Sequence, residues 1–325
     1  MNFEAHTAPD SSVHFILSGG ATSLAANAGN AGARTTSSSP TVSQLLNASN
    51  AEYTGLTPTG LTPFDVNGAQ LSYDNTLVGA VASVWETASD QLILAWQGTT
   101  DLWQVINDIG VYAGAVTLAD TDSLNFAKTV LSDAAAKGIA SANVFLTGQS
   151  LGGIEAEYVA QQTGLAGIAF DPTGVPNNSD AHSGSNFVDI VTAGDPVGNY
   201  ASDLKTEQPF APSSGLNHYG QVITIGSAAD NTTLHNDVHS WGNIFLDPLV
   251  IANLYGLIQD FHYIGVQGHD LGVTFSPYSS STDGSGEQNR PVWSVGGDTI
   301  SQLISAAQSK GNLTAHLSPA ISHGW

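Results

Sequence analysis

The sequence contains no cysteine and very few basic residues. Without cysteine, neither a disulfide nor a thiolate-bound metal site can form. Lys and Arg together number 6 against 28 acidic residues, which gives a formal net charge of −22. Nucleic-acid binding depends on neutralising phosphates with cations, so this balance argues against a nucleic-acid partner. It argues in the same way against binding to an anionic membrane surface, and it fits a soluble protein of an extracellular environment.

Long apolar runs are also lacking. The longest is IFLDPLVIANLYGLI, residues 244–258. It contains Asp247, Pro248 and Asn253, and it is too short and too polar to span a bilayer. The N-terminal residues have no basic region followed by an apolar core, so they are not expected to form a Sec-type signal peptide. We therefore expect a secreted protein that leaves the cell by a route other than a Sec signal.

Strands and helices are expected to alternate from about Leu77 onward. Strands are predicted at 77–85, 91–96, 142–148, 165–172, 187–196 and 221–226, and helices at 121–138 and 151–164. Thr121 or Asp122 can cap the first of these helices. Such alternation predicts an α/β fold with a mainly parallel central sheet and helices on both faces. Ligands of such sheets bind at the carboxyl ends of the strands, where polar residues become candidates for a site.

The segment VFLTGQSLGG, residues 144–153, places Ser150 between two glycines in a G-x-S-x-G pattern. A strand is expected before this serine and a helix after it, which is the context of a nucleophile elbow. Glycine lets the backbone turn sharply without a Cβ clash, and amides at a helix start stabilise negative charge. We predict that Ser150 is a nucleophile; the alternative is an ordinary turn.

A nucleophilic serine needs a base, and the base needs an orienting acid. With this elbow the order along the chain is Ser, acid, His. Asp171 and Asp195 both end predicted strands after Ser150. Asp195 is favoured because it ends the second strand after the elbow, which is the usual place for the acid. Asp171 is the alternative acid, and one of the two is expected only to begin a turn before proline.

The base should follow Asp195, a condition that seven histidines meet: His218, His235, His239, His262, His269, His316 and His323. After the last predicted sheet strand we expect a loop at 227–240 and then an apolar helix that begins near Trp241. His239 lies at the end of that loop and is preferred as the base. His269 and His235 are the alternatives.

Two backbone N–H groups are needed to stabilise the oxyanion that a serine nucleophile creates. One is expected from Leu151, directly after the serine. The other is expected from Thr99 in LILAWQGTTD, where a strand ends and Gly98 frees the backbone. The alternative is a plain β-turn, in which Gly and Thr are common.

Three segments together suggest a family. LILAWQGTTDLWQVINDI, VFLTGQSLGG and TAGDPVGN occur in this order. They resemble the class 3 lipases of the α/β-hydrolase superfamily, and among these the bacterial lipases exported by type I secretion. The family motifs read F-R-G-T, G-H-S-L-G-G and N-D-P-V, and its base lies in an N-D-H segment before an apolar helix with I-A-N-L. HNDVHSWGNIFLDPLVIANL, residues 235–254, looks similar and implies His239 as the base.

The chain departs from the family pattern at several places. Gln97 stands where the family has arginine, Gln149 where it has histidine, and Gly194 where it has asparagine. The calcium-binding G-G-x-G-x-D repeats of the exported relatives are absent from this sequence. The resemblance covers roughly residues 75–262, and we expect an α/β-hydrolase core over residues 71–275 with a candidate lid helix at 241–262. A loop-rich N-terminal extension with a short helix (1–70) would precede it, and a C-terminal extension (276–325) would pack on the core or link onward.

Together these features predict a serine carboxylic-ester hydrolase, a lipase or esterase, that acts through an acyl-enzyme on an ester or lipid substrate. No cofactor is required and no metal ligands are assigned, although acidic loops such as LADTDS leave calcium binding open. The alternative function is a non-catalytic binding module with a hydrolase fold inside a larger secreted protein. The loose N-terminal segment and the Ser/Gly-rich tail permit it, but no triad member is missing.

Overall fold

The computed structural model describes residues 38–100, 116–176, 182–206, 214–238, 248–279, 290–311 and 313–314. All of them belong to one compact unit, Ala33–Trp325. The boundaries expected near residues 70 and 275 fall inside this unit. The first and last strands of its main sheet lie outside the expected core range, so the two extensions help to build the core.

The central element of the unit is a nine-stranded sheet. Its strands are β1 (Leu61–Pro63), β4 (Ser72–Asn75), β5 (Ala80–Thr87), β6 (Leu92–Trp96), β7 (Val144–Gln149), β8 (Ala166–Phe170), β10 (Gly184–Thr192), β12 (Gly220–Ile225) and β13 (Leu313–Thr314). The order is β1-β5-β6-β7-β8-β10-β12-β13, and β4 also pairs with β5. Strands β6, β7, β8, β10 and β12 run parallel, and the remaining pairs are antiparallel. The described residues also form two short ladders, β2 (Asp65–Val66) with β3 (Ala69–Gln70) and β9 (Val175–Pro176) with β11 (Leu216–Asn217).

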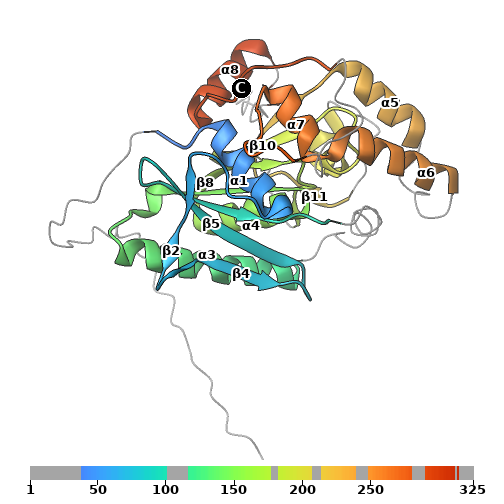
Figure 1. Cartoon of the computed structure of the whole chain (residues 1–325). Coiled ribbons are helices and arrows are strands. Elements are labelled where there is room, and N and C mark those ends of the chain that lie inside the picture. The colour runs from blue at the N-terminus through green and yellow to red at the C-terminus, as the bar shows by residue number, and fades with distance from the viewer. Residues whose placement is uncertain are drawn as a thin grey trace, which may run out of the picture. The chain divides into compact units, whose positions relative to one another are not determined.

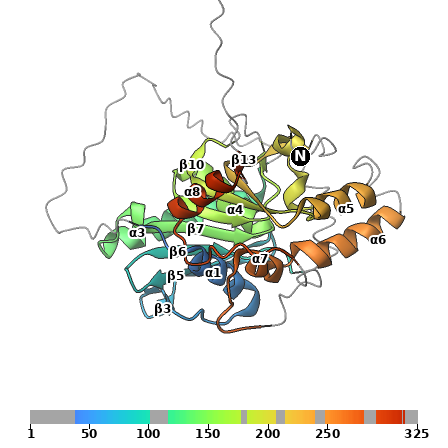
Figure 2. The same cartoon turned by 90° about the horizontal axis from the view of Figure 1, so that it is seen from above.

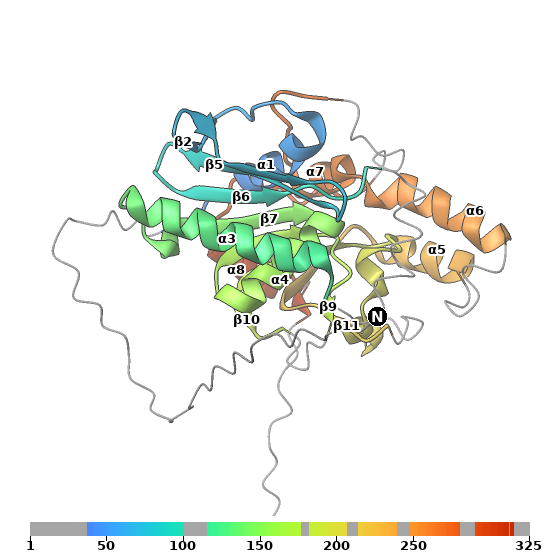
Figure 3. The ribbon, with the colours of Figure 1, turned by 90° about the horizontal axis from the view of Figure 1, so that it is seen from below.

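Helices cover both faces of the sheet. The described helices are α1 (Val42–Thr54), α3 (Leu118–Ala136), α4 (Leu151–Thr163), α5 (Ala228–Val238), α6 (Pro248–Leu257), α7 (Ile264–Leu271) and α8 (Ile300–Lys310). Helices α1, α7 and α8 lie on one side and α3 and α4 on the other (Figures 1 and 3). Seen from above, α1 lies along β6 and β7, and α8 lies along β10 (Figure 2).

Strand β6, LILAW, shows why helices must pack on both faces of the sheet. Ile93 and Ala95 join the apolar cluster under α1 and α8, whereas Leu92, Leu94 and Trp96 join the cluster under α3 and α4. All five are fully buried, as expected of a strand inside a parallel sheet with helices on both faces. A mainly parallel sheet covered in this way, with a strand–serine–helix turn at its centre, confirms the predicted α/β-hydrolase fold.

Two local predictions were wrong. Helix α3 is capped by Thr117 rather than by Thr121 or Asp122, because Thr117 and Asp120 bond reciprocally to each other's backbone N–H groups. The expected loop at 227–240 contains helix α5, which is mostly polar and buries only Leu234 and Val238. No described helix has both the length and the apolar character needed to cross a bilayer.

Candidate active site

Ser150 occupies the sharp turn between β7 and α4. Its backbone has φ 59° and ψ −126°, a conformation that residues with a side chain rarely adopt. The flanking glycines permit the turn: a Cβ on Gly148 would overlap the carbonyl of Gly152, and a Cβ on Gly152 would overlap the end of β6 at Trp96. The strand–serine–helix turn that the sequence predicted is therefore present, and the spacing of its glycines follows from close backbone contact.

The imidazole of His262 bridges Ser150 and Asp195. Its Nε2 lies 2.8 Å from Ser150 Oγ, and its Nδ1 lies 3.0 Å from Asp195 Oδ2. His262 ends the π-helical turn Ile258–His262, which follows α6; such turns are frequent at functional sites. With Nδ1–H donated to a carboxylate, Nε2 is left as an acceptor for the serine hydroxyl. The arrangement can therefore take a proton from Ser150.

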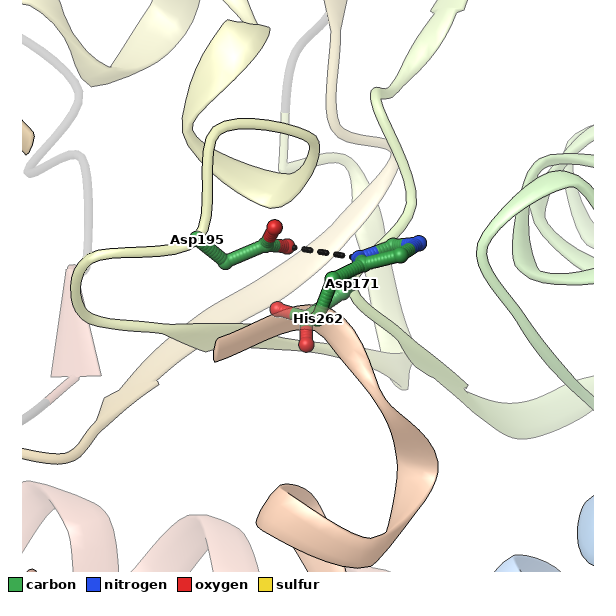
Figure 4. A group of neighbouring side chains, drawn as sticks. All are labelled: Asp171, Asp195 and His262. Atoms are coloured by element: carbon green, nitrogen blue, oxygen red, sulfur yellow. Dashed lines mark hydrogen bonds and ion pairs between the residues drawn. The ribbon is translucent and has the colours of Figure 1, made fainter. Parts of the chain in front are cut away.

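Asp195 is held in the turn after β10 by the protein backbone. Its Oδ1 accepts a hydrogen bond from the N–H of Val197 at 3.0 Å, and its Oδ2 accepts one from Gly198 at 2.8 Å. The residue is fully buried, and its carboxylate faces the imidazole of His262 (Figure 4). The structure thus brings together Ser150 and Asp195, the predicted nucleophile and the favoured acid.

Asp171, the alternative acid, lies in the same cluster. It follows β8, and its two oxygens accept hydrogen bonds from the backbone N–H of Thr192 at 2.6 Å and from the Thr192 hydroxyl at 2.8 Å. Burial raises the pKa of Asp171 well above its ordinary value, and the charge of Asp195 adds to the rise. One side-chain oxygen or nitrogen from each of Asp171, Asp195 and His262 lies within 4.8 Å of the other two.

This cluster has the residue types of a metal site, and among the described residues it is the one such group. Its carboxylate oxygens accept backbone and side-chain hydrogen bonds, and both imidazole nitrogens have protein partners. The three side chains therefore face one another and the protein, a geometry that suits proton transfer between a hydroxyl, an imidazole and a carboxylate.

Thr99 and Leu151, the predicted oxyanion donors, belong to two backbone segments that flank Ser150. Leu151 is the first residue of α4. The segment after β6 comes so close that a Cβ on Gly98 would lie 3.1 Å from Ser150 Cβ. Both segments therefore approach the serine, and the start of α4 adds the partial positive charge of a helix N-terminus.

Of the three predicted bases, His235 and His269 belong to the described residues, and neither contacts Ser150 or Asp195. His239 lies outside the described residues, as do positions 241–247 of the candidate lid helix. His269 is on α7 and contacts Asp270 at 3.2 Å, and His235 is exposed on α5. Because α5 and α6 both precede His262, it comes later in the chain than the loop at 227–240 in which the base was expected. Its sequence signal is its place at the end of the short turn that follows the apolar I-A-N-L helix.

Gln149, which departs from the family pattern, takes part in the site as well. Its side chain contacts His262 and the hydroxyl of Tyr53 on α1. The sequence identified the position as a departure but indicated no role for it. The structure shows it linking the elbow to the residue that faces the serine.

Known protein families and curated proteins yield no match to this chain. Similar solved structures include a Rhizomucor miehei lipase propeptide complex, with TM-score 0.42 and 16% identity over 58% of this chain and 67% of that one. The extracellular lipase LipA from Serratia marcescens has TM-score 0.31 and 20% identity, over 42% of this chain and 28% of that one. A carboxylesterase from Mesorhizobium loti has TM-score 0.26 and 13% identity, over 50% of this chain and 97% of that one. The chemistry of the site rests on its own geometry.

Proposed function

We propose that this protein is a serine hydrolase of carboxylic esters, with Ser150 as nucleophile, His262 as base and Asp195 as the orienting acid. The observation that carries the proposal is the hydrogen-bonded line from Ser150 Oγ through both nitrogens of His262 to Asp195, with lengths of 2.8 and 3.0 Å. His262 takes the role that the sequence assigned to His239. The residues and their order along the chain, Ser, Asp, His, match the arrangement that an elbow of this type requires.

In the acylation step, His262 Nε2 takes the hydroxyl proton of Ser150 while Oγ attacks the ester carbonyl carbon. Asp195 stabilises the imidazolium that forms and keeps Nδ1–H directed toward itself. When the tetrahedral intermediate collapses, the bond to the alcohol oxygen breaks and His262 gives its proton to that oxygen. His262 then takes a proton from water, hydroxide attacks the acyl group, and carboxylic acid leaves as Ser150 regains its proton.

The oxyanion of each tetrahedral intermediate would be held by the backbone N–H groups of Thr99 and Leu151. Support comes from the approach of the two segments to Ser150 and from the helix that begins at Leu151. Ser150 and His262 are at most 5% exposed. Fixed dipoles act more strongly where water is excluded, so the burial favours this form of stabilisation.

The substrate class is an ester or lipid, on the strength of the resemblance to class 3 lipases. The same triad also serves peptidases, thioesterases and acyltransferases, so the triad supports the chemistry more directly than the substrate. An extracellular place of action agrees with the acidic composition. Helix α6 packs Leu254 and Leu257 against α5 and leaves Leu249 68% exposed, which suits an apolar wall near the site.

The experiment compares wild type with Ser150→Ala on p-nitrophenyl esters from acetate to palmitate. We expect hydrolysis by the wild type and a loss of about 10⁴-fold or more in kcat for the variant. A fluorophosphonate should label the wild type and not the variant. Circular dichroism controls for folding of both. Absence of both hydrolysis and labelling in a folded wild type would contradict the proposal and would favour the binding module instead.

A further inference from the structure

Asp171 gives the site a second carboxyl that the triad does not need. It is fully buried, and its φ of 48° lies in the left-handed region, which is costly for a residue with a side chain and persists only where the surroundings enforce it. The next residue is Pro172. The side-chain amide of Gln267 on α7 also donates to Asp171 Oδ2. This strained position directs the carboxyl into the cluster instead of into solvent.

Gly198 allows the carboxyls of Asp171 and Asp195 to approach each other. A Cβ on Gly198 would lie 2.7 Å from Asp171 Oδ1 and 3.2 Å from Asp195 Oδ2, so any side chain there would force the pair apart. With His262 the two carboxyls form a group of three whose donor atoms lie within 4.8 Å (Figure 4). The titratable groups that face Asp171 among the described residues are therefore Asp195 and His262.

Two carboxylates within 4.8 Å of each other in a buried site repel when both are charged, which favours a pair that carries one proton. Asp195 accepts two backbone N–H groups and also faces Nδ1 of His262. Asp171 accepts hydrogen bonds from one backbone N–H, the Gln267 amide and the Thr192 hydroxyl, all of which are neutral donors. The ionised form is therefore better supported on Asp195. Burial, together with the charge of Asp195, raises the pKa of Asp171 well above its ordinary value.

We propose that Asp171 holds a proton and donates a hydrogen bond to Asp195, as a positioning residue that keeps a single negative charge behind His262. This inference rests on the proposed function. Asp171 acts through Asp195, whose carboxylate it orients toward Nδ1. A second charge would hold the imidazolium too strongly and slow the return of its proton to the leaving alcohol. A neutral Asp171 orients Asp195 without that penalty.

Two variants of Asp171 and one control test the inference. Asp171→Asn keeps a hydrogen-bond donor and removes the acid, whereas Asp171→Ala removes both. Asp189→Asn is the matched control, because Asp189 on β10 is equally buried and burial raises its pKa to about 6. In infrared difference spectra at about pH 8, Asp171→Asn should remove the C=O band of a protonated carboxyl. Asp189→Asn should remove bands of a carboxylate, and the same result at Asp171 would overturn the inference.

Kinetics supplies the second readout. Asp171→Ala should lower kcat about 10-fold with KM unchanged, and Asp171→Asn should restore most of the loss. In Asp171→Asn the acid limb of kcat/KM should move by less than about half a pH unit, because no charge is lost. If the acid limb of Asp171→Asn instead moves to lower pH by about one unit or more, the substitution has removed a negative charge. Asp171 would then be ionised in the wild type, which would overturn the inference. If the wild type hydrolyses no ester, the proposed function fails together with the catalytic role of Asp171, while the infrared band still reports its proton.

Discussion

The side-chain amide of Gln149 donates a hydrogen bond to the main-chain carbonyl of His262, with 2.7 Å between nitrogen and oxygen. The hydroxyl of Tyr53 donates to the amide oxygen of Gln149 at 2.5 Å and so determines which way the amide is turned. Gln149, the residue before Ser150, therefore joins α1, the elbow and the π-helical turn that carries His262. This link makes the N-terminal helix part of the support of the site.

Removal of this link should slow catalysis without weakening substrate binding. We expect Gln149→Leu to lower kcat about 10-fold with KM changed less than about twofold, because the orientation of His262 is affected and the substrate contacts are not. Tyr53→Phe should have a smaller effect in the same direction. In a double-mutant cycle the combined variant should be no worse than Gln149→Leu, and full additivity would show that Tyr53 does not act through Gln149.

The identity of the base can be decided by three substitutions. His262→Asn should lower kcat by about 10⁴-fold while leaving the fold intact, because the serine then has no proton acceptor. His239→Asn and His269→Asn, at the two histidines favoured by sequence, should each retain activity within about threefold of wild type. A loss in His239→Asn alone, measured on the same p-nitrophenyl ester, would contradict the role proposed for His262.

Local patterns were sufficient for the elbow and for six strands of the sheet, whereas β1, β4 and β13 were not predicted. The buried runs that became β6 and β7 and the spacing of Gly148, Ser150 and Gly152 depend on neighbours along the chain, so the sequence predicted them well. His262 could not be found in this way. Its position depends on α5 and α6, and the polar composition of α5 resembles that of a loop. The partnership of Asp171 with Asp195 is equally hidden, because it depends on the pairing of β8 with β10.

Stability should fall as pH rises from about 5 to about 9. Burial raises the pKa of Glu52 to about 7 and that of Asp189 to about 6. Although burial opposes it, the Asp203 carboxylate raises the pKa of His218 to about 9. Each of these groups binds its proton more tightly in the folded state. Its contribution to stability is complete below the unfolded pKa and is lost as pH rises through the folded pKa.

Thermal unfolding across a pH series measures this trend. Glu52→Gln should make the melting temperature decline less steeply between about pH 4.5 and 7, the window between the unfolded and folded pKa values of Glu52. Asp203 acts in the opposite direction: despite its burial, the neighbouring His218 lowers its pKa, so stability should also fall at strongly acidic pH. The net charge of −22 adds repulsion as pH rises. A melting temperature that increases from about pH 5 to 7 would contradict the assignment.

Arg290 is expected to be the basic side chain on which stability depends most. Its side chain is only 5% exposed. It is one of just 6 basic residues in the chain. Its guanidinium contacts Asp270 on α7 at 2.6 Å and Asp230 on α5 at 3.1 Å. It also lies 5.1 Å from the ring centre of Phe261, the residue before His262. The side chain thus links α5 to α7, the helix that follows the turn carrying His262.

Arg290→Met should lower the free energy of unfolding by about 3–5 kcal/mol, because it leaves the buried carboxylate of Asp270 without a counter-charge. Lys310→Met is the matched control: Lys310 is exposed and lies 4.8 Å from the ring centre of Trp293, so its loss should cost no more than about 1 kcal/mol. Adding Asp270→Asn to Arg290→Met should recover part of the loss, since the unpaired charge is then removed as well. Urea unfolding of all three measures the differences. Equal midpoints for Arg290→Met and Lys310→Met would mean that the ion pairs of Arg290 do not stabilise the link between α5 and α7.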